Sequence, residues 1–386
     1  MAKKKIAVVG GGLGGTTAAV LLQRAGYDCT LYEQAPVFGR VGAGINIAPN
    51  ATRIFRAMGL EKKLLDVGVQ PRLKFSRQWD NGEVLFVVDT PELTKLYDAP
   101  FLALHRGDLQ SVIASALAPD SVRFNKHLEG VQPVGDRVEI AFADGSRDVV
   151  DAVVGADGVH SKVRTAVLGP EPPSYHGLVA HRAIFSTSKL KTPNIADNTK
   201  WWAPESYFLN YFIREARDEM YFITGVPEVW EGPDFTPRPV GKEGVRRAFE
   251  GWHPEVQEMV EAAESITKWP MLERMPLAPW TRESVVLMGD AAHPTTPHMG
   301  QGAGMAFEDA VVLVRCIESV GGDDLPRAFR LFEKTRYDRT SRIQRDSHAN
   351  EWTKKSMDHK WVYGYDAFNV ELGVPSIGSG AVPRVA

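Results

Sequence analysis

The feature that most constrains this chain is the run GGGLGG at residues 10–15. It lies between two apolar stretches, the first with the pattern of a strand and the second with that of a helix. The preceding stretch, KIAVV at 5–9, is typical of a buried strand, and TTAAVLLQR at 16–24 is typical of a helix that Gly26 ends. A second strand is predicted for DCTLYE at 28–33, which completes a strand–helix–strand unit of about 30 residues. The sequence therefore predicts an α/β fold around a parallel sheet.

The glycine run fits the G-x-G-x-x-G pattern, with Gly10, Gly12 and Gly15 at the three signature positions. In a dinucleotide-binding fold the first glycine makes the turn, the second lets the main chain approach a pyrophosphate, and the third lets helix and strand pack closely. The helix start offers free N–H groups and a positive potential to phosphates. Glu33, at the end of the second strand, is expected to accept from ribose hydroxyls. The alternative is a glycine turn in an α/β fold without a ligand, which this context disfavours.

Two later carboxylates also follow apolar runs. Asp157 follows DAVVG at 151–155, and Asp290 follows VVLM at 285–288. Ligands of α/β sheets bind beyond the carboxyl ends of the strands. Each carboxylate could instead have a purely structural role, since Asp157 can be a turn residue and Asp290 a helix cap. Three such strand ends in one chain, with Glu33 as the first, indicate an extended dinucleotide.

The middle of the chain differs from the two ends. It is rich in aromatic residues and in short alternating runs such as MYFIT at 220–224, which predict an antiparallel sheet. The α/β pattern returns after residue 280, and a long helical stretch is expected over 325–355. The predicted division is a discontinuous nucleotide-binding domain of residues 1–75, 100–175 and 276–325, an inserted β-rich substrate domain of 76–99 and 176–275, a C-terminal helical segment of 326–372 and a flexible tail of 373–386.

Charge and composition exclude several classes of function. The net charge of −3 gives no basic surface, so neither nucleic acid nor an anionic membrane is expected as a partner. The two cysteines, Cys29 and Cys316, lie in apolar stretches, so we expect neither a disulfide framework nor a metal site. The first residues resemble a signal peptide, but their apolar run breaks at glycine after four residues, and no stretch is long enough to span a bilayer. A cytoplasmic protein is expected.

The motifs, in this order, resemble the single-component FAD-dependent aromatic hydroxylases of the p-hydroxybenzoate and salicylate hydroxylase type. The similarity covers nearly the whole chain, and members that act on 6-hydroxynicotinate are most similar around GADGVHSKVR, LVAHRA, ESITKWP, DAAHPTTPHMGQGAGMAFEDA and WVYGYD. The resemblance implies a Rossmann-like FAD-binding domain with an inserted, mostly antiparallel substrate domain. It also implies tightly bound FAD and a transient NADH or NADPH, which suits a chain without a second glycine fingerprint.

The resemblance assigns FAD contacts to the glycine loop, to two arginines and to the loops that follow three strands. Arg40 and Arg106 would meet the pyrophosphate and the ribityl chain, although Arg106 can also be read as a surface residue at a helix start. Leu128 would touch the adenine side through its main chain, and Asp290 would accept from a ribityl hydroxyl. The implied FAD-binding residues are Gly10, Gly12, Leu13, Gly14, Gly15, Glu33, Gln34, Arg40, Arg106, Leu128, Asp157, Asp290, Pro297, Gly300, Gly302 and Ala303.

The implied reaction uses molecular oxygen and a small aromatic substrate. In such enzymes a flavin hydroperoxide transfers its distal oxygen to an electron-rich ring carbon, and the site must exclude water. The favoured reaction converts 6-hydroxynicotinate to 2,5-dihydroxypyridine with loss of carbon dioxide. A salicylate-type benzenoid hydroxylase and a flavin dehydrogenase or oxidase are the alternatives. Whether the protein is a monomer or a homodimer is left open.

The substrate residues are expected on one strand and one loop. Alternation in YFLNY at 207–211 puts Tyr207, Leu209 and Tyr211 on one face, where ordinary sheet packing is the alternative reading. His298, in the loop after Asp290, is expected to hydrogen-bond the ring hydroxyl and to titrate near neutral pH, unless it only packs or caps. The catalytic residues are predicted as His298, Tyr211 and Asn46, and the substrate contacts as Tyr207, Tyr211, His298, Asn198 and Leu209.

Three positions depart from the 6-hydroxynicotinate pattern. Members of that group carry histidine at the position of Asn46, cysteine at that of Asn198 and histidine at that of Tyr207. An asparagine cannot act as a base near neutral pH, because it only donates and accepts hydrogen bonds. Either His298 or water then takes the proton, or the substrate arrives ionised, or the ring differs.

Overall fold

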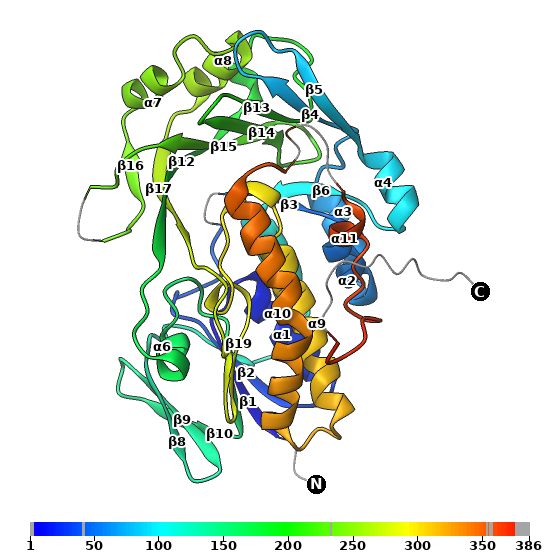
Figure 1. The fold of residues 1–386 in the computed structure, drawn as a ribbon, viewed down its shortest axis with the longest axis vertical. Coiled ribbons are helices and arrows are strands. Elements are labelled where there is room, and N and C mark those ends of the chain that lie inside the picture. The colour runs from blue at the N-terminus through cyan, green and yellow to red at the C-terminus, as the bar shows by residue number, and fades with distance from the viewer. Residues whose placement is uncertain (1–3, 41–42, 232–233, 353, 355–357, 375–386) are drawn as a thin grey trace.

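The computed structural model describes residues 4–40, 43–231, 234–352, 354 and 358–374. Figure 1 shows two tiers, a lower one built on a sheet and long helices and an upper one built on a larger sheet. Most of the predicted tail, residues 375–386, lies outside the described residues. Within them, every helix is too short or too polar to serve as a membrane span.

The lower tier contains a six-stranded sheet in the order β18-β19-β11-β1-β2-β7. The central strands β19, β11, β1, β2 and β7 are mutually parallel, and Val9 of β1 pairs with both Tyr32 and Gly155. The strands are β1 (Lys5–Val9), β2 (Asp28–Tyr32), β7 (Val122–Arg123), β11 (Ala152–Gly155), β18 (Thr281–Arg282) and β19 (Val285–Leu287). Because parallel neighbours end together, Glu33, Asp157 and Asp290 follow strands at one edge of the sheet, as the sequence predicted.

Helices cover this sheet, and the two longest, α9 and α10, run side by side (Figure 1). Helix α1 begins at Leu13, inside the glycine fingerprint and three residues before the predicted start. The predicted helix over 325–355 ends at Ala349, because Asn350 adopts a left-handed conformation with φ of 51°. The helices of this tier are α1 (Leu13–Arg24), α2 (Pro49–Ala57), α3 (Glu61–Val67), α4 (Thr90–Tyr97), α5 (Arg106–Ala114), α6 (Lys162–Leu168), α9 (Gly302–Ser319), α10 (Leu325–Ala349) and α11 (Lys360–Tyr363).

The upper tier is an eight-stranded sheet in the order β16-β17-β12-β15-β14-β13-β4-β5. All its neighbours are antiparallel except β13 and β4, and helices α7 (Lys242–Ala248) and α8 (Pro254–Ala262) cover its outer face (Figure 1). Its strands are β4 (Leu73–Gln78), β5 (Val84–Asp89), β12 (Ser174–Ser186), β13 (Asn198–Trp202), β14 (Tyr207–Phe212), β15 (Glu219–Pro227), β16 (Arg238–Val240) and β17 (Ile266–Glu273). The predicted inserted, mostly antiparallel sheet is confirmed.

Smaller sheets complete the lower tier. Strands β3 (Gly44–Ile47) and β6 (Leu102–His105) form an antiparallel pair between the two tiers. Strands β8 (Leu128–Val134), β9 (Arg137–Phe142) and β10 (Arg147–Val150) form a separate antiparallel sheet. Three short 3₁₀ turns are η1 (Thr187–Lys189), η2 (Gly289–Ala291) and η3 (Pro297–Met299).

A buried ionic network joins α9, α10 and the loop after β19. Arg336 lies 2.8 Å from Glu308 and 2.7 Å from Asp309, and Arg339 lies 2.8 Å from Glu308. His293 Nε2 lies 2.6 Å from Asp309 Oδ2, so the loop is tied to α9. Although burial opposes ionisation, His293 and Arg336 lower the pKa of Asp309 to about 2. His293 thus holds the loop in place.

Candidate active site

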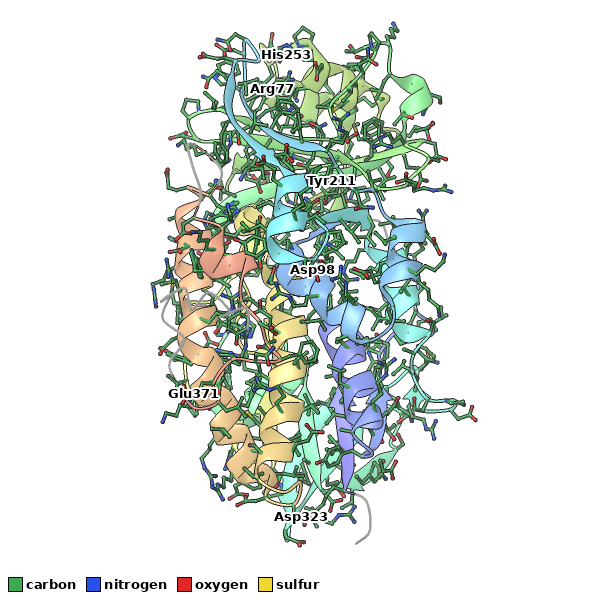
Figure 2. The ribbon with its side chains drawn as sticks, turned by 90° about the vertical axis from the view of Figure 1, so that its right-hand side faces the viewer. Arg77, Asp98, Tyr211, His253, Asp323 and Glu371 are labelled. Atoms are coloured by element: carbon green, nitrogen blue, oxygen red, sulfur yellow. The ribbon has the colours of Figure 1, made fainter. Side chains whose placement is uncertain are left out.

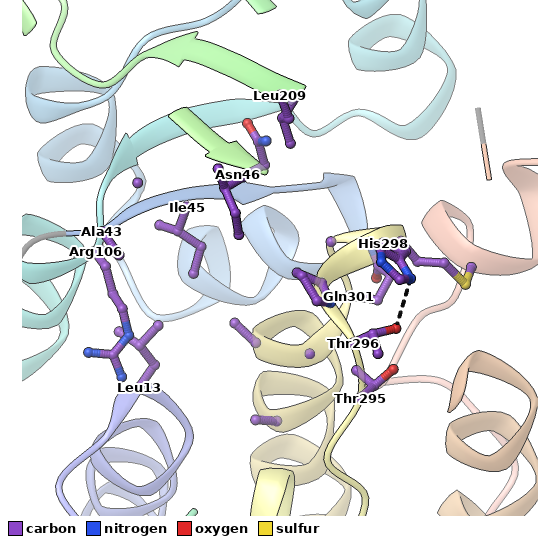
Figure 3. Close-up of a pocket in the computed structure, with 18 of the residues that line it drawn as sticks. Leu13, Ala43, Ile45, Asn46, Arg106, Leu209, Thr295, Thr296, His298 and Gln301 are labelled. Carbon is purple, nitrogen blue, oxygen red and sulfur yellow. Dashed lines mark hydrogen bonds between the residues drawn. The ribbon is translucent and has the colours of Figure 1, made fainter. Parts of the chain in front are cut away.

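A cavity of about 400 Å³ lies between the two tiers, which is a volume typical of small-molecule sites. Its walls are the glycine loop after β1, strand β3, the inner face of the upper sheet and the loop between β19 and α9. Figure 3 shows Leu13 and Arg106 on one side of it, His298 on the opposite side, and Asn46 and Leu209 above. We call the region of Gly12, Leu13, Arg106 and Asp290 the glycine end, and the region of Tyr207, Leu209, Tyr211 and His298 the aromatic end.

The glycines of the fingerprint have two different tasks. A Cβ atom on Gly15 would lie 2.0 Å from the carbonyl oxygen of Gly10, and one on Gly14 would lie 2.8 Å from the side chain of Ala306. These two glycines therefore allow close packing. Among the described residues, a Cβ on Gly12 would meet only Arg106, at 3.9 Å, so Gly12 leaves open space at the glycine end. The N-cap residue of α1, Gly12, has no side chain that could cap the helix, so the first N–H groups of α1 remain available to a ligand.

Asp290 is the one carboxylate that lines this cavity among the described residues. Its side chain is exposed to the open space of the cavity, although protein surrounds the site. Burial raises its pKa, while His293 and Arg106 oppose that shift. Placed close to Arg106, the carboxylate can accept hydrogen bonds from hydroxyl groups of a ligand.

Glu33 and Asp157 point into the protein instead. The Glu33 carboxylate accepts from the Gly11 N–H at 2.6 Å and from the Ala35 N–H at 2.7 Å. Asp157 accepts from the Ser161 hydroxyl at 2.5 Å and from main-chain N–H groups at the start of α6. Each carboxylate thus shapes a main-chain turn, and Ala156 and Gly158, on either side of Asp157, line the cavity in its place.

Three other predicted residues lie away from the cavity lining. Arg40 is exposed and pairs with Asp108 of α5 and Glu219 of β15, at 3.0 Å in each case. Gln34 is exposed, and Leu128 begins β8. None of these three side chains meets the cavity.

The loop before α9 lines the cavity with main chain. Pro297, Gly300, Gly302 and Ala303, four of the residues predicted to bind FAD, all line the cavity, and Gly300 adopts φ of +64°, which favours glycine. No heavy atom lies within 4 Å of a Cβ built on Gly300, so this loop leaves room for a flat group.

The aromatic end is built on alternate residues of β14. Tyr207, Leu209 and Tyr211 line the cavity, whereas Phe208 packs into the core on the other face, so the predicted alternation is confirmed. Figure 2 shows Tyr211 at the level where the two tiers meet. Among the described residues, the hydroxyls of Tyr207 and Tyr211 form no hydrogen bond. Burial raises the pKa of both phenols, which stay neutral and can donate to a ligand.

His298 lies in η3 with its two ring nitrogens in different environments. Nδ1 lies 2.8 Å from the Ser347 carbonyl oxygen and 3.1 Å from the Thr296 hydroxyl, the contact drawn in Figure 3. Because a carbonyl only accepts, we assign the proton to Nδ1, which leaves a lone pair on Nε2 without a partner among the described residues. Burial, with Lys200 adding to it, lowers the His298 pKa to about 3. The expected titration of His298 near neutral pH is therefore wrong for the ligand-free site. Burial and the positive charge of Lys200 both disfavour a protonated imidazole there.

Asn46 of β3 and Asn198 of β13, two of the departures from the pattern, contact one another. Asn198 Nδ2 donates to Asn46 Oδ1 at 3.2 Å, and both residues line the cavity. The strand β3 comes this close to the upper sheet because of Gly44, where a Cβ would lie 2.6 Å from Tyr221 and 2.8 Å from Tyr211. The structure thus brings Asn46, Asn198, Tyr207, Tyr211 and His298 to one cavity.

Several lining residues were not predicted from the sequence, namely Lys74, Arg182, Lys200, Thr296 and Gln301. For Lys200 a signal was present, because alternation in NTKWW places it on the same strand face as Asn198, which was predicted. Lys74 and Arg182 come from separate strands and carry no local pattern.

One cluster outside the cavity lining has residue types that bind metals. Atoms of His176, Glu273 and His348 lie within 4.8 Å of one another, and two imidazoles with a carboxylate form a ligand set that zinc accepts. However, His348 Nδ1 lies 2.9 Å from Glu273, so an ordinary hydrogen bond accounts for two of the three groups. We assign no metal to this cluster.

The glycine end fits an extended dinucleotide with a flat ring. Free N–H groups of α1 and the Arg106 guanidinium suit phosphates, and Asp290 suits hydroxyls. The open main chain around Gly12 and Gly300 provides the room.

Comparisons with known proteins agree with this reading. Residues 3–324 match the family described as FAD binding domain. The sequence is 44% identical over 382 residues to 6-hydroxynicotinate 3-monooxygenase of Pseudomonas fluorescens, which covers 98% of this chain and 99% of that protein.

Solved structures share the fold. HpxO of Klebsiella pneumoniae, solved with FAD and uric acid, matches with a TM-score of 0.80 and 27% identity over 92% of this chain and 90% of that one. A substrate complex of salicylate hydroxylase matches with a TM-score of 0.81 and 21% identity over 95% of this chain and 96% of that one.

Proposed function

This chain belongs to the FAD binding domain family, and we propose that it hydroxylates a hydroxylated pyridine carboxylate, with 6-hydroxynicotinate as the best candidate. The enzyme is an FAD-dependent aromatic monooxygenase with NADH or NADPH as the transient reductant. One observation carries the proposal for the substrate. A single cavity joins the glycine end, which suits a dinucleotide, to the aromatic end, where polar atoms lack a hydrogen-bond partner among the described residues. Bound FAD supplies the activation of oxygen and its transfer to the substrate ring.

We assign the coenzyme contacts to the glycine end. The N-terminus of α1 and Arg106 would bind the pyrophosphate, and Asp290 would accept from a ribityl hydroxyl. Glu33 and Asp157 would act through the main-chain turns that they hold, at Gly11 and at the start of α6. The loop containing Gly300 would lie beside the flat ring.

We assign the orientation of the substrate to the aromatic end. The lone pair on His298 Nε2 would accept the hydrogen bond of the ring hydroxyl, which raises electron density at the ring carbon that is attacked. The phenols of Tyr207 and Tyr211 would donate to the remaining oxygens of the substrate. The buried walls exclude water from the reacting centre.

A benzenoid acid, as hydroxylated by salicylate-type enzymes, is the second candidate. The observation that favours it is the hydrogen bond between Asn198 and Asn46, at 3.2 Å. This contact occupies an amide group that would otherwise be free to bind a ring nitrogen. Because the departures all lie at the aromatic end, they bear on the ring and leave the coenzyme class unchanged.

A substrate panel tests the proposal. The purified enzyme would be given 6-hydroxynicotinate, salicylate and 3-amino-4-hydroxybenzoate in turn, and nicotinamide oxidation, hydrogen peroxide and product mass would be measured together. We expect coupled hydroxylation, with little peroxide, for 6-hydroxynicotinate. Coupled turnover of salicylate with none of 6-hydroxynicotinate would establish the second candidate instead.

A further inference from the structure

Two lysines line the aromatic end of the cavity, on neighbouring strands of the upper sheet. Lys74 of β4 pairs in register with Asn198 of β13, and Lys200 lies two residues further along β13, on the same face. Lys200 is only 7% exposed. Lysines are seldom buried in this way without a charged partner.

Neither ammonium group has an acidic partner in the described part of the chain. The charged groups that act on Lys200 are Lys74 and Lys354, both of them cations, and no acidic group acts on Lys74. Lys200 Nζ instead lies 3.4 Å from the Asn350 amide oxygen and 3.8 Å from the centre of the Trp202 ring. Lys74 Nζ lies 4.0 Å from the centre of the Phe101 ring. Aromatic faces stabilise a cation only weakly and leave its charge uncompensated.

The distribution of charge over the cavity wall is uneven. Asp290, the one acidic lining residue among those described, lies at the glycine end close to Arg106. Arg182 of β12, three strands away from Lys200 in the sheet, adds a further cation to the lining. A buried charge without a partner costs free energy, so a ligand that supplies a negative group here would gain from pairing with it.

We propose that Lys200 and Lys74 together bind an anionic group of the aromatic substrate, its carboxylate, and select acids over neutral rings. This inference rests on the proposed function, since it concerns the substrate of the same site. Lys200 is the principal contact because Trp202 and Tyr207 hold its ammonium, the latter with its ring centre 4.7 Å away. The Tyr207 ring also lies 5.4 Å from the His298 ring, so one substrate can meet Lys200 and His298 together.

The test compares an acid with its neutral amide, which has nearly the same shape. Equilibrium dialysis of the FAD-loaded enzyme would give the Kd of 6-hydroxynicotinate and of 6-hydroxynicotinamide, and likewise of salicylate and salicylamide. We expect Lys200→Gln to weaken binding of the preferred acid by about 10- to 100-fold, the scale of a lost charged hydrogen bond, with the amide changed by less than about twofold. Lys74→Gln should act in the same direction but less strongly, and Lys200→Arg should retain most of the affinity.

Lys95→Gln is the matched control, because Lys95 is exposed on α4 and lies outside the cavity lining. The proposal is overturned if Lys200→Gln binds the acid as tightly as the parent enzyme, or weakens acid and amide equally. It is also overturned if the parent enzyme prefers the acid in neither pair. If the parent enzyme binds the acids selectively through Lys200 but hydroxylates none of them, the proposed function fails while the binding site stands.

Discussion

The two ends of the cavity are built from different parts of the chain. At the glycine end the lining is largely main chain and glycine, supported from behind by Glu33, Asp157 and the buried network around Asp309. At the aromatic end the lining consists of side chains from separate elements, and several of their polar atoms, such as His298 Nε2, lack a partner among the residues that the structure describes. The glycine end has a shape that suits FAD whatever the substrate is. The aromatic end has charges and hydrogen-bond acceptors that select the aromatic substrate.

This difference has a consequence for substitution. Changes behind the glycine end should affect folding and coenzyme content, and changes at the aromatic end should affect turnover and selectivity while the protein keeps its flavin. The following variants can break or sharpen that contrast.

Gly15→Ala should have the largest effect. Its Cβ would lie 2.0 Å from the Gly10 carbonyl oxygen, so α1 cannot keep its distance from β1. We expect purified protein almost without FAD, measured as the ratio of flavin to protein absorbance. Gly130→Ala is the control, because no heavy atom lies within 4 Å of a Cβ there. If Gly15→Ala retained its full flavin content, the claim that changes at the glycine end reduce FAD binding would be contradicted.

Arg336→Met should mainly lower the free energy of unfolding. The change leaves Glu308 and Asp309 short of a buried cation, and breaking such a network costs about 3–5 kcal/mol. Urea unfolding followed by circular dichroism measures the loss. Arg345→Met, at an exposed position of the same helix, should stay within about 0.5 kcal/mol of the parent enzyme. Equal stability of the two variants would show that the network does not support the loop.

His298→Ala should slow hydroxylation by about 100-fold, which is typical for a lost group that assists proton transfer, while the FAD content stays unchanged. Product formation under saturating oxygen measures the rate. Because the His298 pKa is about 3, we expect no titration of this residue near neutral pH in the ligand-free enzyme. His127→Ala, at an exposed position, serves as the control. An unchanged coupled rate in His298→Ala would remove this residue from the site.

The smallest effect is expected in the pH dependence of acid binding. Burial, with Lys74 and Lys354 adding repulsion, lowers the pKa of Lys200 to about 7. Below that pH the ammonium is charged and attracts the acid; as the pH rises through it, the attraction is lost. Kd for the acid should therefore rise by up to about tenfold per pH unit above neutrality. Tyr207 and His298, the other titratable neighbours, stay neutral across this range.

Lys200→Arg should weaken this dependence, because a guanidinium stays charged throughout. The dependence that remains would come from Lys74, whose pKa burial lowers to about 8. The neutral amide has no carboxylate to pair with the lysine. Its Kd should therefore stay the same across this pH range in the parent enzyme and in Lys200→Arg. A parent enzyme whose affinity for the acid is the same at about pH 6 and about pH 9 would contradict the assignment of Lys200.

The glycine end was largely predictable from the sequence. The fingerprint and the carboxylates that follow β2, β11 and β19 are local patterns, and parallel strands bring their ends to one edge. The direction of each carboxylate was not predictable. Asp157 and Asp290 occupy similar places in the sequence pattern, yet Asp157 accepts from the N–H groups of α6 whereas Asp290 faces the cavity. The orientation of each carboxylate depends on the helix that follows its loop.

The aromatic end was predictable only in part. Alternation in β14 placed Tyr207, Leu209 and Tyr211 on one face. Lys74 and Lys200 meet at the cavity only because β4 and β13 pair in parallel, a contact between segments more than a hundred residues apart. The pKa of His298 likewise depends on burial and on Lys200, which no local pattern contains.

The central claim is that one cavity holds FAD at its glycine end and an acidic aromatic ring at its aromatic end. Turnover of the parent enzyme with 6-hydroxynicotinate under ¹⁸O₂ tests this most directly. The account predicts one labelled oxygen atom in each molecule of product, with nicotinamide oxidation matched to product. Reoxidation of the flavin entirely to hydrogen peroxide, with no labelled product from 6-hydroxynicotinate or from any other ring acid in the panel, would contradict it.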